Sequence, residues 1–212
     1  MPVPSAATYP EAKSVQQKYA YLISNIFDRK DVIGYSYTGS GKTLAFTIPL
    51  LAAIDFRISA AQNAQAMIIC PTRELAAQVA SVVRKIGRHI TEGGGLRIAI
   101  LCGGTPGSLQ KKALDKGVHV IVGTPGRIND HLQRGRLDLT AIKTVVLDEA
   151  DKMLDMGFEE QTANILSAIP AAHKVQTAFF SGMRAFWLQM IFYTQALSTI
   201  LICRSDEILN GH

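Results

Sequence analysis

Short apolar segments alternate with longer amphipathic segments along most of the chain. The short segments are rich in valine and isoleucine and apolar at nearly every position, which is typical of strands buried on both faces of a parallel sheet. The longer segments show the spacing of apolar positions found in amphipathic helices. The alternation predicts an α/β fold, a mostly parallel sheet covered by helices on both faces. The predicted strands are 31–36, 66–70, 96–102, 118–123, 143–149, 175–181 and 198–203, and the predicted helices are 42–55, 72–89, 109–116, 126–135 and 159–169.

Proline and glycine residues mark polar loops that follow several of the predicted strands. Pro71, Pro106 and Pro125 each come shortly after a strand, and the last two have glycines beside them. Loops of this kind lie at the carboxyl edge of a parallel sheet, where open α/β sheets bind ligands. No internal repeat, low-complexity tract or linker interrupts the alternation, so one sheet accounts for the whole chain.

Length and charge narrow the picture only slightly. The chain has 212 residues, which at about 100–200 residues per domain corresponds to one domain or one and a half. Its hydrophobic content of 48% is enough for a buried core, and its 22 Lys and Arg exceed its 17 Asp and Glu by five. A mild positive charge permits a polyanionic partner and equally suits an ordinary soluble protein, so charge leaves both interpretations open.

The cysteines and one uncharged segment bear on the compartment. Cys70, Cys102 and Cys203 match neither a metal-binding nor a disulfide pattern, so we interpret them as small buried side chains in a reducing compartment. Residues 185–203 carry no charge but include several polar residues. We interpret them as a buried helix followed by a short strand rather than a membrane helix. The N-terminus lacks the apolar core of a signal peptide, so we expect an intracellular, cytoplasmic protein, and a nuclear location stays open. We also expect a monomer that has no membrane partner.

A phosphate-binding loop is indicated by the string Thr38-Gly39-Ser40-Gly41-Lys42-Thr43. It follows a predicted strand and opens a predicted helix, which is the context that such a loop requires. The glycines allow backbone N–H groups to turn toward phosphate oxygens at the helix N-terminus. Lys42 would reach the β- and γ-phosphates of a nucleotide, and Thr43 would hold Mg²⁺. The usual first glycine is replaced by Ser36.

A second acidic site follows the apolar strand Val145–Leu147, where Asp148 and Glu149 emerge together. Asp148 would bind Mg²⁺ through water, and Glu149 would orient and deprotonate the attacking water. Two carboxylates at a strand end can also serve merely as a helix N-cap. The phosphate-binding loop in the same chain favours the catalytic interpretation.

At these residues the chain resembles the DEAD-box RNA helicases. Residues 148–151 spell D-E-A-D, and "PTRELA" at 71–76, Gly103-Gly104 and "TPGR" at 124–127 are similar to other motifs of that family in the same order. The family has a small residue in the first slot of its phosphate loop, so Ser36 is a mild departure. The stretches 100–132 and 147–160 look like the DbpA-like branch. The resemblance implies a RecA-like P-loop NTPase domain over residues 31–212, preceded by a Q-motif region and leading helix in residues 1–30, with the family's second RecA-like domain absent.

The resemblance also implies roles for individual residues, with ATP and Mg²⁺ as ligands and the RNA backbone as partner. Hydroxyls, a guanidinium and unobstructed backbone amides suit contacts to phosphates and sugars rather than to bases. The implied catalytic residues are Lys42, Asp148 and Glu149; the ATP-binding residues are Gln16, Thr38, Gly39, Ser40, Gly41, Lys42 and Thr43; the Mg²⁺ ligands are Thr43 and Asp148; the RNA-binding residues are Pro71, Thr72, Arg73, Gly103, Gly104, Thr124, Gly126 and Arg127; and the residues that couple hydrolysis to strand separation are Asp151 and Ser181.

Several positions depart from the family pattern. The family's Ser-Ala-Thr motif reads Ser181-Gly182-Met183, which puts coupling in doubt, and Tyr35 and Tyr37 flank the first slot of the phosphate loop. The aromatic residue that precedes the Q-motif glutamine by 17 positions would fall before Met1, so we expect weakened adenine binding. An arginine finger from a second domain is worth roughly 10³–10⁵ in rate. We therefore expect the chain alone to be weakly active or inactive.

Three functions remain open from the sequence. The first is the ATP-binding half of an RNA helicase and RNA-dependent ATPase. The second is a degenerate helicase fragment that binds RNA or a protein without catalysis, which Met183 and the tyrosines favour. The third is a DNA-directed helicase of the same superfamily, against which "PTRELA", "TPGR" and the complete D-E-A-D favour RNA.

Overall fold

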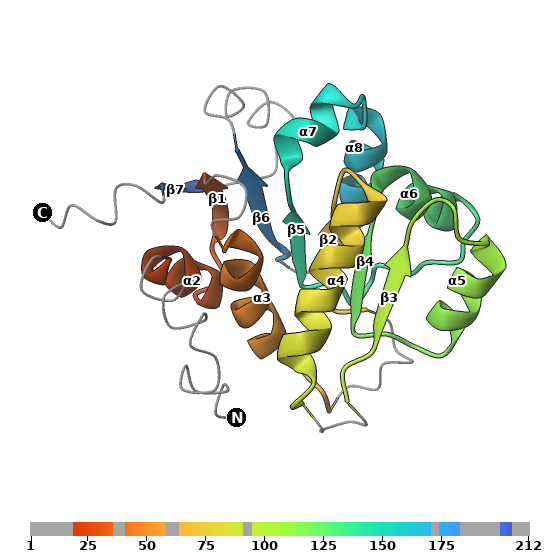
Figure 1. Cartoon of the computed structure of the whole chain (residues 1–212), viewed down its shortest axis with the longest axis horizontal. Helices are drawn as coiled ribbons and strands as arrows, with labels where there is room; N and C mark the ends of the chain where they lie inside the picture. Colours follow the sequence, from red (N-terminus) through yellow and green to blue (C-terminus); the bar gives the residue numbers. More distant parts are fainter. Residues whose placement is uncertain are drawn as a thin grey trace, which may run out of the picture.

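The computed structural model describes residues 19–35, 41–57, 64–90, 95–170, 174–182 and 200–204. Seven strands form one sheet in the order β3-β4-β2-β5-β6-β1-β7, and every pair of neighbours is parallel (Figure 1). The strands are β1 Asp31–Tyr35, β2 Ala66–Ile69, β3 Ile98–Leu101, β4 Val120–Gly123, β5 Thr144–Leu147, β6 Gln176–Ser181 and β7 Ile200–Arg204. The helices are α2 Ala20–Phe27, α3 Lys42–Ala52, α4 Arg73–Gly87, α5 Gly107–Asp115, α6 Pro125–Gln133, α7 Ala150–Asp155 and α8 Glu159–Ser167.

The seven predicted strands and five predicted helices are confirmed, and the sheet is parallel as expected. The short helix α7 was missed, because the periodicity of an amphipathic helix cannot develop over so few residues. The strand predicted at the end of the uncharged segment is confirmed as β7, whereas the helix predicted before it lies outside the described residues. None of the described helices is both long and apolar enough to cross a membrane.

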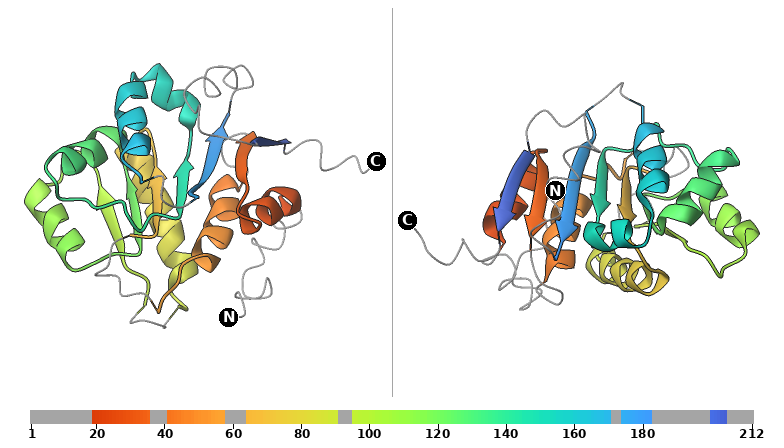
Figure 2. Two further views of the ribbon diagram at one scale, coloured as in Figure 1. Left: turned by 180° about the vertical axis from the view of Figure 1, so that it is seen from behind. Right: turned by 90° about the horizontal axis from the view of Figure 1, so that it is seen from above.

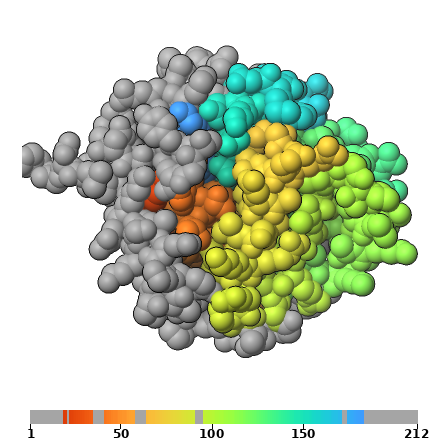
Figure 3. Space-filling model, in the orientation of Figure 1, coloured from red at the N-terminus to blue at the C-terminus, as the bar shows by residue number. Residues whose placement is uncertain are grey.

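Helices cover both faces of the sheet because successive residues of each strand point to opposite sides. One core cluster joins α2, α3 and α4 to residues such as Val32, Ile68 and Phe180. The second core cluster joins α6, α7 and α8 to residues one position further along the same strands, such as Ile33 and Ile69. The view from above in Figure 2 shows the two helical layers with the sheet between them. In the layer formed by α2, α3 and α4, the surface of α4 makes up much of the face seen in Figure 3.

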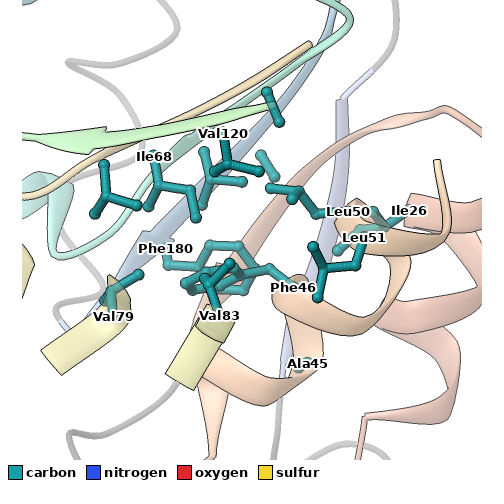
Figure 4. Packing of buried hydrophobic residues seen from close by; sticks show 14 of the residues in the cluster. Ile26, Ala45, Phe46, Leu50, Leu51, Ile68, Val79, Val83, Val120 and Phe180 are labelled. Carbon is teal, nitrogen blue, oxygen red and sulfur yellow. The ribbon is translucent and has the colours of Figure 1, made fainter. Parts of the chain in front are cut away.

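An aromatic pair anchors α3 to the centre of the sheet. The rings of Phe46 in α3 and Phe180 in β6 lie 5.0 Å apart between centroids and are tilted by 50° (Figure 4). Both side chains are fully buried, and Val79 and Val83 of α4 lie beside them (Figure 4). The helix that begins at Lys42 is therefore packed directly on the strand that ends at Ser181.

Polar side chains fasten the opposite, amino edge of the sheet. Arg29 donates to the Thr144 hydroxyl and to the Lys143 carbonyl, each at 2.8 Å. The Gln176 amide donates to the Ile26 carbonyl at 2.8 Å. These bonds tie the junction of α2 and β1 to the first residues of β5 and β6, and so fix where β1 starts.

Cys70 and Cys102 are buried free thiols, as expected. Burial raises the pKa of both groups, that of Cys70 well above its usual value. Neither thiol is therefore ionised at neutral pH. The side chain of Cys203 lies outside the described set.

The close approach of β3 and β4 predicts a steric effect at Gly123. A Cβ atom there would overlap the backbone carbonyl of Leu101, whereas one at Gly126 would have nothing within 4 Å. We expect Gly123→Ala to lower the free energy of unfolding by about 1–3 kcal/mol, because backbone atoms must shift to relieve the overlap. Gly126→Ala is the matched control and should leave stability unchanged or slightly raised. Equal urea midpoints for the two variants would contradict this account.

Candidate functional site at the carboxyl edge of the sheet

The strand order divides the carboxyl edge, at the top of Figure 1, into two neighbouring halves. Adjacent β1, β6 and β5 lead into the predicted nucleotide loops, whereas adjacent β2, β4 and β3 lead into the predicted RNA loops. Because neighbouring strands lie about 4.8 Å apart, the loops within each half are within reach of one ligand. The nucleotide half comprises Gly41–Thr43, Ser181–Gly182 and Asp148–Asp151, and the nucleic-acid half comprises Pro71–Arg73, Thr124–Arg127 and Gly103–Gly104.

Only the end of the predicted phosphate-binding loop lies within the described residues, from Gly41 onward. Gly41 is the N-cap of α3 in the left-handed region, with φ of 96°, which favours glycine. Lys42 follows at the first helical position, only 6% exposed. The predicted residues Gln16, Thr38, Gly39 and Ser40, and the departures at Ser36, Tyr37 and Met183, lie outside the described residues.

Asp148 is a buried carboxyl group with an unusual pKa. It is 3% exposed, and burial raises its pKa to about 6 even though the positive charge of Lys42 acts to lower it. Its Oδ1 accepts a hydrogen bond from the Glu149 amide at 3.1 Å. The Asp148 amide donates to the Ile69 carbonyl of β2 at 2.9 Å, which fixes where β5 ends. The Lys42 ammonium therefore compensates the Asp148 carboxylate only in part.

Glu149 combines a strained backbone with a tethered side chain. Its φ of 52° places it in the left-handed region, which costs a residue other than glycine about 1–3 kcal/mol. Its Oε2 accepts from the Lys152 ammonium at 2.9 Å, and this bond raises the pKa of Lys152. Glu149 is the N-cap of α7, but its side chain makes no capping bond. A simple capping role therefore does not account for its carboxylate.

Asp151 links the acidic loop to the end of β6. Its Oδ2 accepts from the backbone amide of Gly182 at 3.1 Å, and its side chain is largely buried. The adjoining Ser181 is 1% exposed. The contact between the two motifs thus includes a backbone group, which does not depend on a hydroxyl in the position of Met183.

In the nucleic-acid half, Arg73, Gly104 and Arg127 converge. A Cβ atom at Gly104, whose φ is 83°, would lie 2.5 Å from Nη1 of Arg73. The Nη1 of Arg127 donates to the Thr105 carbonyl beside that glycine at 3.2 Å. Thr72 caps α4, its hydroxyl accepting from the Leu75 amide at 3.2 Å. The geometry brings two guanidinium groups to one glycine loop.

The other predicted RNA-binding residues are placed less uniformly. Gly103 and Gly126 have open space where a side chain would stand, so a ligand backbone has room there. Pro71 and Thr124 are buried, and the Thr124 amide donates to the Leu101 carbonyl of β3 at 3.0 Å. The Thr124 bond therefore ties the end of β4 to the end of β3.

Two buried polar residues behind this half were not predicted. Gln110 of α5 and His131 of α6 are 3% and 0% exposed, and their side chains hydrogen-bond to each other. Both stand in correctly predicted helices, but periodicity gives no signal that a polar side chain at these positions turns inward.

The raised pKa of Asp148 predicts a pH-dependent stability. A carboxyl group whose pKa rises from 3.8 to about 6 on folding stabilises the folded state only when protonated, so the stability is lost as pH rises through this window. The loss corresponds to about 3 kcal/mol. We expect Asp148→Asn to unfold at higher urea than the parent at about pH 8, in the absence of nucleotide, and to differ little at about pH 4. Asp155→Asn, which replaces an exposed carboxyl group nearby, is the control, and a difference independent of pH would refute the interpretation.

Comparison with known proteins gives a family match over most of the chain. Residues 13–182 match the family described as DEAD/DEAH box helicase. The chain is 46% identical over 163 residues to the ATP-dependent RNA helicase DeaD of Klebsiella pneumoniae, which covers 77% of this chain and 24% of that protein. It is 44% identical over 163 residues to the ATP-dependent RNA helicase DbpA of Escherichia coli (77% and 34%), and 45% identical over 174 residues to the DEAD-box ATP-dependent RNA helicase CshA of Bacillus cereus (82% and 31%). The chain thus spans a quarter to a third of these relatives.

Solved structures show the same fold. A DEAD box protein from the hyperthermophile Methanococcus jannaschii superposes with a TM-score of 0.77 at 34% identity, over 89% of this chain and 49% of that one. The yeast DEAD-box splicing factor Prp28 superposes with a TM-score of 0.74 at 30% identity, over 82% and 41%. The predicted RecA-like fold and the resemblance drawn from the motifs are therefore confirmed. The chain belongs to the DEAD/DEAH box helicase family.

Proposed function

We propose that this chain is the ATP-binding and RNA-backbone-binding domain of a DEAD-box RNA helicase. In the full-length protein it would couple ATP binding and hydrolysis to the remodelling of RNA duplexes. The observation that carries the proposal is the partly compensated pair of buried charges, Lys42 and Asp148, on the same sheet edge as the Arg73–Gly104–Arg127 cluster. We further propose that residues 31–212 form the RecA-like domain behind a Q-motif region in residues 1–30, and that a second RecA-like domain completes the site.

In the nucleotide half, Lys42 would bind the β- and γ-phosphates of ATP, supported by the backbone amides at the start of α3. Gln16, Thr38, Gly39, Ser40 and Gly41 complete the proposed ATP site. Glu149 would hold the attacking water and accept its proton, a task for which the strained backbone presents its carboxylate beside Asp148. Release of that carboxylate from Lys152 is the local rearrangement that this role requires.

The residues also fit Mg²⁺, although no group of three or more His, Cys, Asp and Glu side chains gathers as a metal site in the described part of the chain. The Asp148 carboxylate is buried with too little positive charge around it, which a cation would supply. Thr43 and Asp148 would hold the ion, Asp148 through water. When bound, Mg²⁺ would neutralise phosphate charge as it develops.

In the nucleic-acid half, Arg73 and Arg127 would bind phosphates, with Thr72, Gly103, Gly104 and Gly126 offering hydroxyl or backbone groups to the same strand. Pro71 and Thr124 would shape the loops. Contacts of this kind carry no base preference, so binding would be independent of sequence. Asp151 and Ser181 would transmit the state of the nucleotide half through β6.

The nucleotide proposal predicts different effects for two substitutions. We expect Lys42→Ala to abolish detectable binding of a fluorescent ATP analogue, because the ammonium compensates the phosphates. Glu149→Gln should retain that binding, because the ammonium is still present. It should lower the rate of phosphate release by a factor of about 10²–10⁴, since proton transfer is lost. Phosphate release with and without RNA is the measurement. ATP binding that survives Lys42→Ala would favour a non-catalytic helicase fragment.

The RNA proposal predicts a uniform effect of Arg73→Ala. We expect weaker binding of single-stranded RNA of any sequence, with a logarithmic salt dependence reduced by about 0.7 for the lost phosphate contact. Arg84→Ala, at the far end of α4, is the control and should change neither quantity. Fluorescence anisotropy across a salt series tests this. Tighter binding of single-stranded DNA than of RNA of the same sequence would instead support the DNA-directed alternative.

A further inference from the structure

A buried hydrogen-bonded pair stands directly behind the loop that carries Gly103 and Gly104. Gln110 lies in the second turn of α5, and His131 lies near the end of α6. The Nε2 atom of His131 and the Oε1 atom of Gln110 are 2.9 Å apart. Neither residue belongs to the loops assigned to the nucleotide or to RNA, so the proposed function does not explain why the pair is there.

The partners of the Gln110 amide fix the direction of every bond in this pair. Its Nε2 donates to the carbonyl of Cys102 at 2.7 Å, and more weakly to that of Thr105 at 3.5 Å. Carbonyl oxygens only accept, so the nitrogen must face the loop and the oxygen must face His131. The proton of the neutral imidazole is therefore on Nε2, while burial lowers the pKa of His131 and favours that neutral form.

The two carbonyls stand on either side of the Gly103–Gly104 turn, so one side-chain amide holds both ends of the loop. The Thr105 carbonyl also accepts from Arg127. Gly104 meets the guanidinium of Arg73 so closely that a Cβ atom there would overlap it. A small rotation of the loop would therefore move Gly104 relative to both arginines.

We propose that His131 and Gln110 are positioning residues that hold the Gly103–Gly104 loop against Arg73 in the arrangement that binds the RNA backbone. This inference rests on the proposed RNA-binding function. His131 orients Gln110, and Gln110 orients the loop. The Nδ1 atom of His131 is buried without a hydrogen-bond partner, which lowers the free energy of unfolding. An apolar side chain at this position would not have that cost. An apolar residue, however, could not keep the Gln110 amide turned toward the loop.

Three substitutions separate positioning from simple packing. Gln110→Glu keeps the shape of the side chain but turns carboxyl oxygens toward the two carbonyls. His131→Phe keeps a ring and removes the donor, whereas His131→Gln retains an amide N–H close to the place of Nε2. Gln133→Leu replaces an exposed glutamine of α6 and serves as the control. The affinity of the 212-residue chain for a labelled single-stranded uridine RNA, its affinity for a fluorescent ATP analogue and its Tm are measured for each variant.

We expect Gln110→Glu and His131→Phe to raise the Kd for RNA about tenfold, the effect of one buried hydrogen bond, with the Kd for the ATP analogue unchanged. His131→Gln should restore most of the RNA affinity. Amide hydrogen exchange of residues 103–105 should be faster in the two disrupting variants and unchanged in α4. A structural role alone would lower Tm and weaken both ligands together, without rescue, and that result overturns the inference.

The same assay separates this inference from the proposed function. An RNA affinity that falls with Arg73→Ala but not with Gln110→Glu or His131→Phe overturns the positioning role and leaves the proposed RNA face in place. An RNA affinity that none of these substitutions changes overturns the proposed RNA face, and the inference with it.

Discussion

The position of β6 between β1 and β5 constrains the whole carboxyl edge. It sets the predicted phosphate-binding loop and the acidic loop two strands apart at the same edge of the sheet. It also places Gly182 where its amide reaches Asp151. Because β2 lies on the other side of β5, the nucleic-acid half begins directly beside the acidic loop. A displacement of β5 or β6 would therefore shift loops in both halves.

The packing of Phe46 on Phe180 extends this constraint to the helical layer. It joins the helix that begins at Lys42 to the strand that ends at Ser181 through side chains without polar atoms. Such contacts are dense and have little freedom to rearrange. The start of α3 and the end of β6 are thus expected to move as one unit, which would let a change at the proposed phosphate site reach Asp151.

Strand identity could be predicted from the sequence because each strand is buried on both faces and therefore continuously apolar. Strand order could not, since nothing in the segment 31–36 indicates that its neighbours are β6 and β7 rather than β2. The motifs located the glycine and carboxylate loops, but not the strain at Glu149 or the inward turn of Gln110 and His131. Those features depend on contacts between segments far apart in the sequence. The sequence does not distinguish a polar helical residue that faces solvent from one that faces a buried carbonyl.

Two residues other than glycine adopt the left-handed conformation in the described structure, Arg29 and Glu149. The strain at Arg29 is offset locally, because its side chain makes two hydrogen bonds of 2.8 Å to residues at the start of β5. The Glu149 carboxylate accepts a hydrogen bond from Lys152, whose side chain is 53% exposed, and exposed ion pairs contribute about 0–1 kcal/mol. Backbone strain of this kind is found at functional sites, where it positions a reacting group. The contrast therefore supports the role proposed for Glu149, whereas the amino edge is held by side-chain hydrogen bonds.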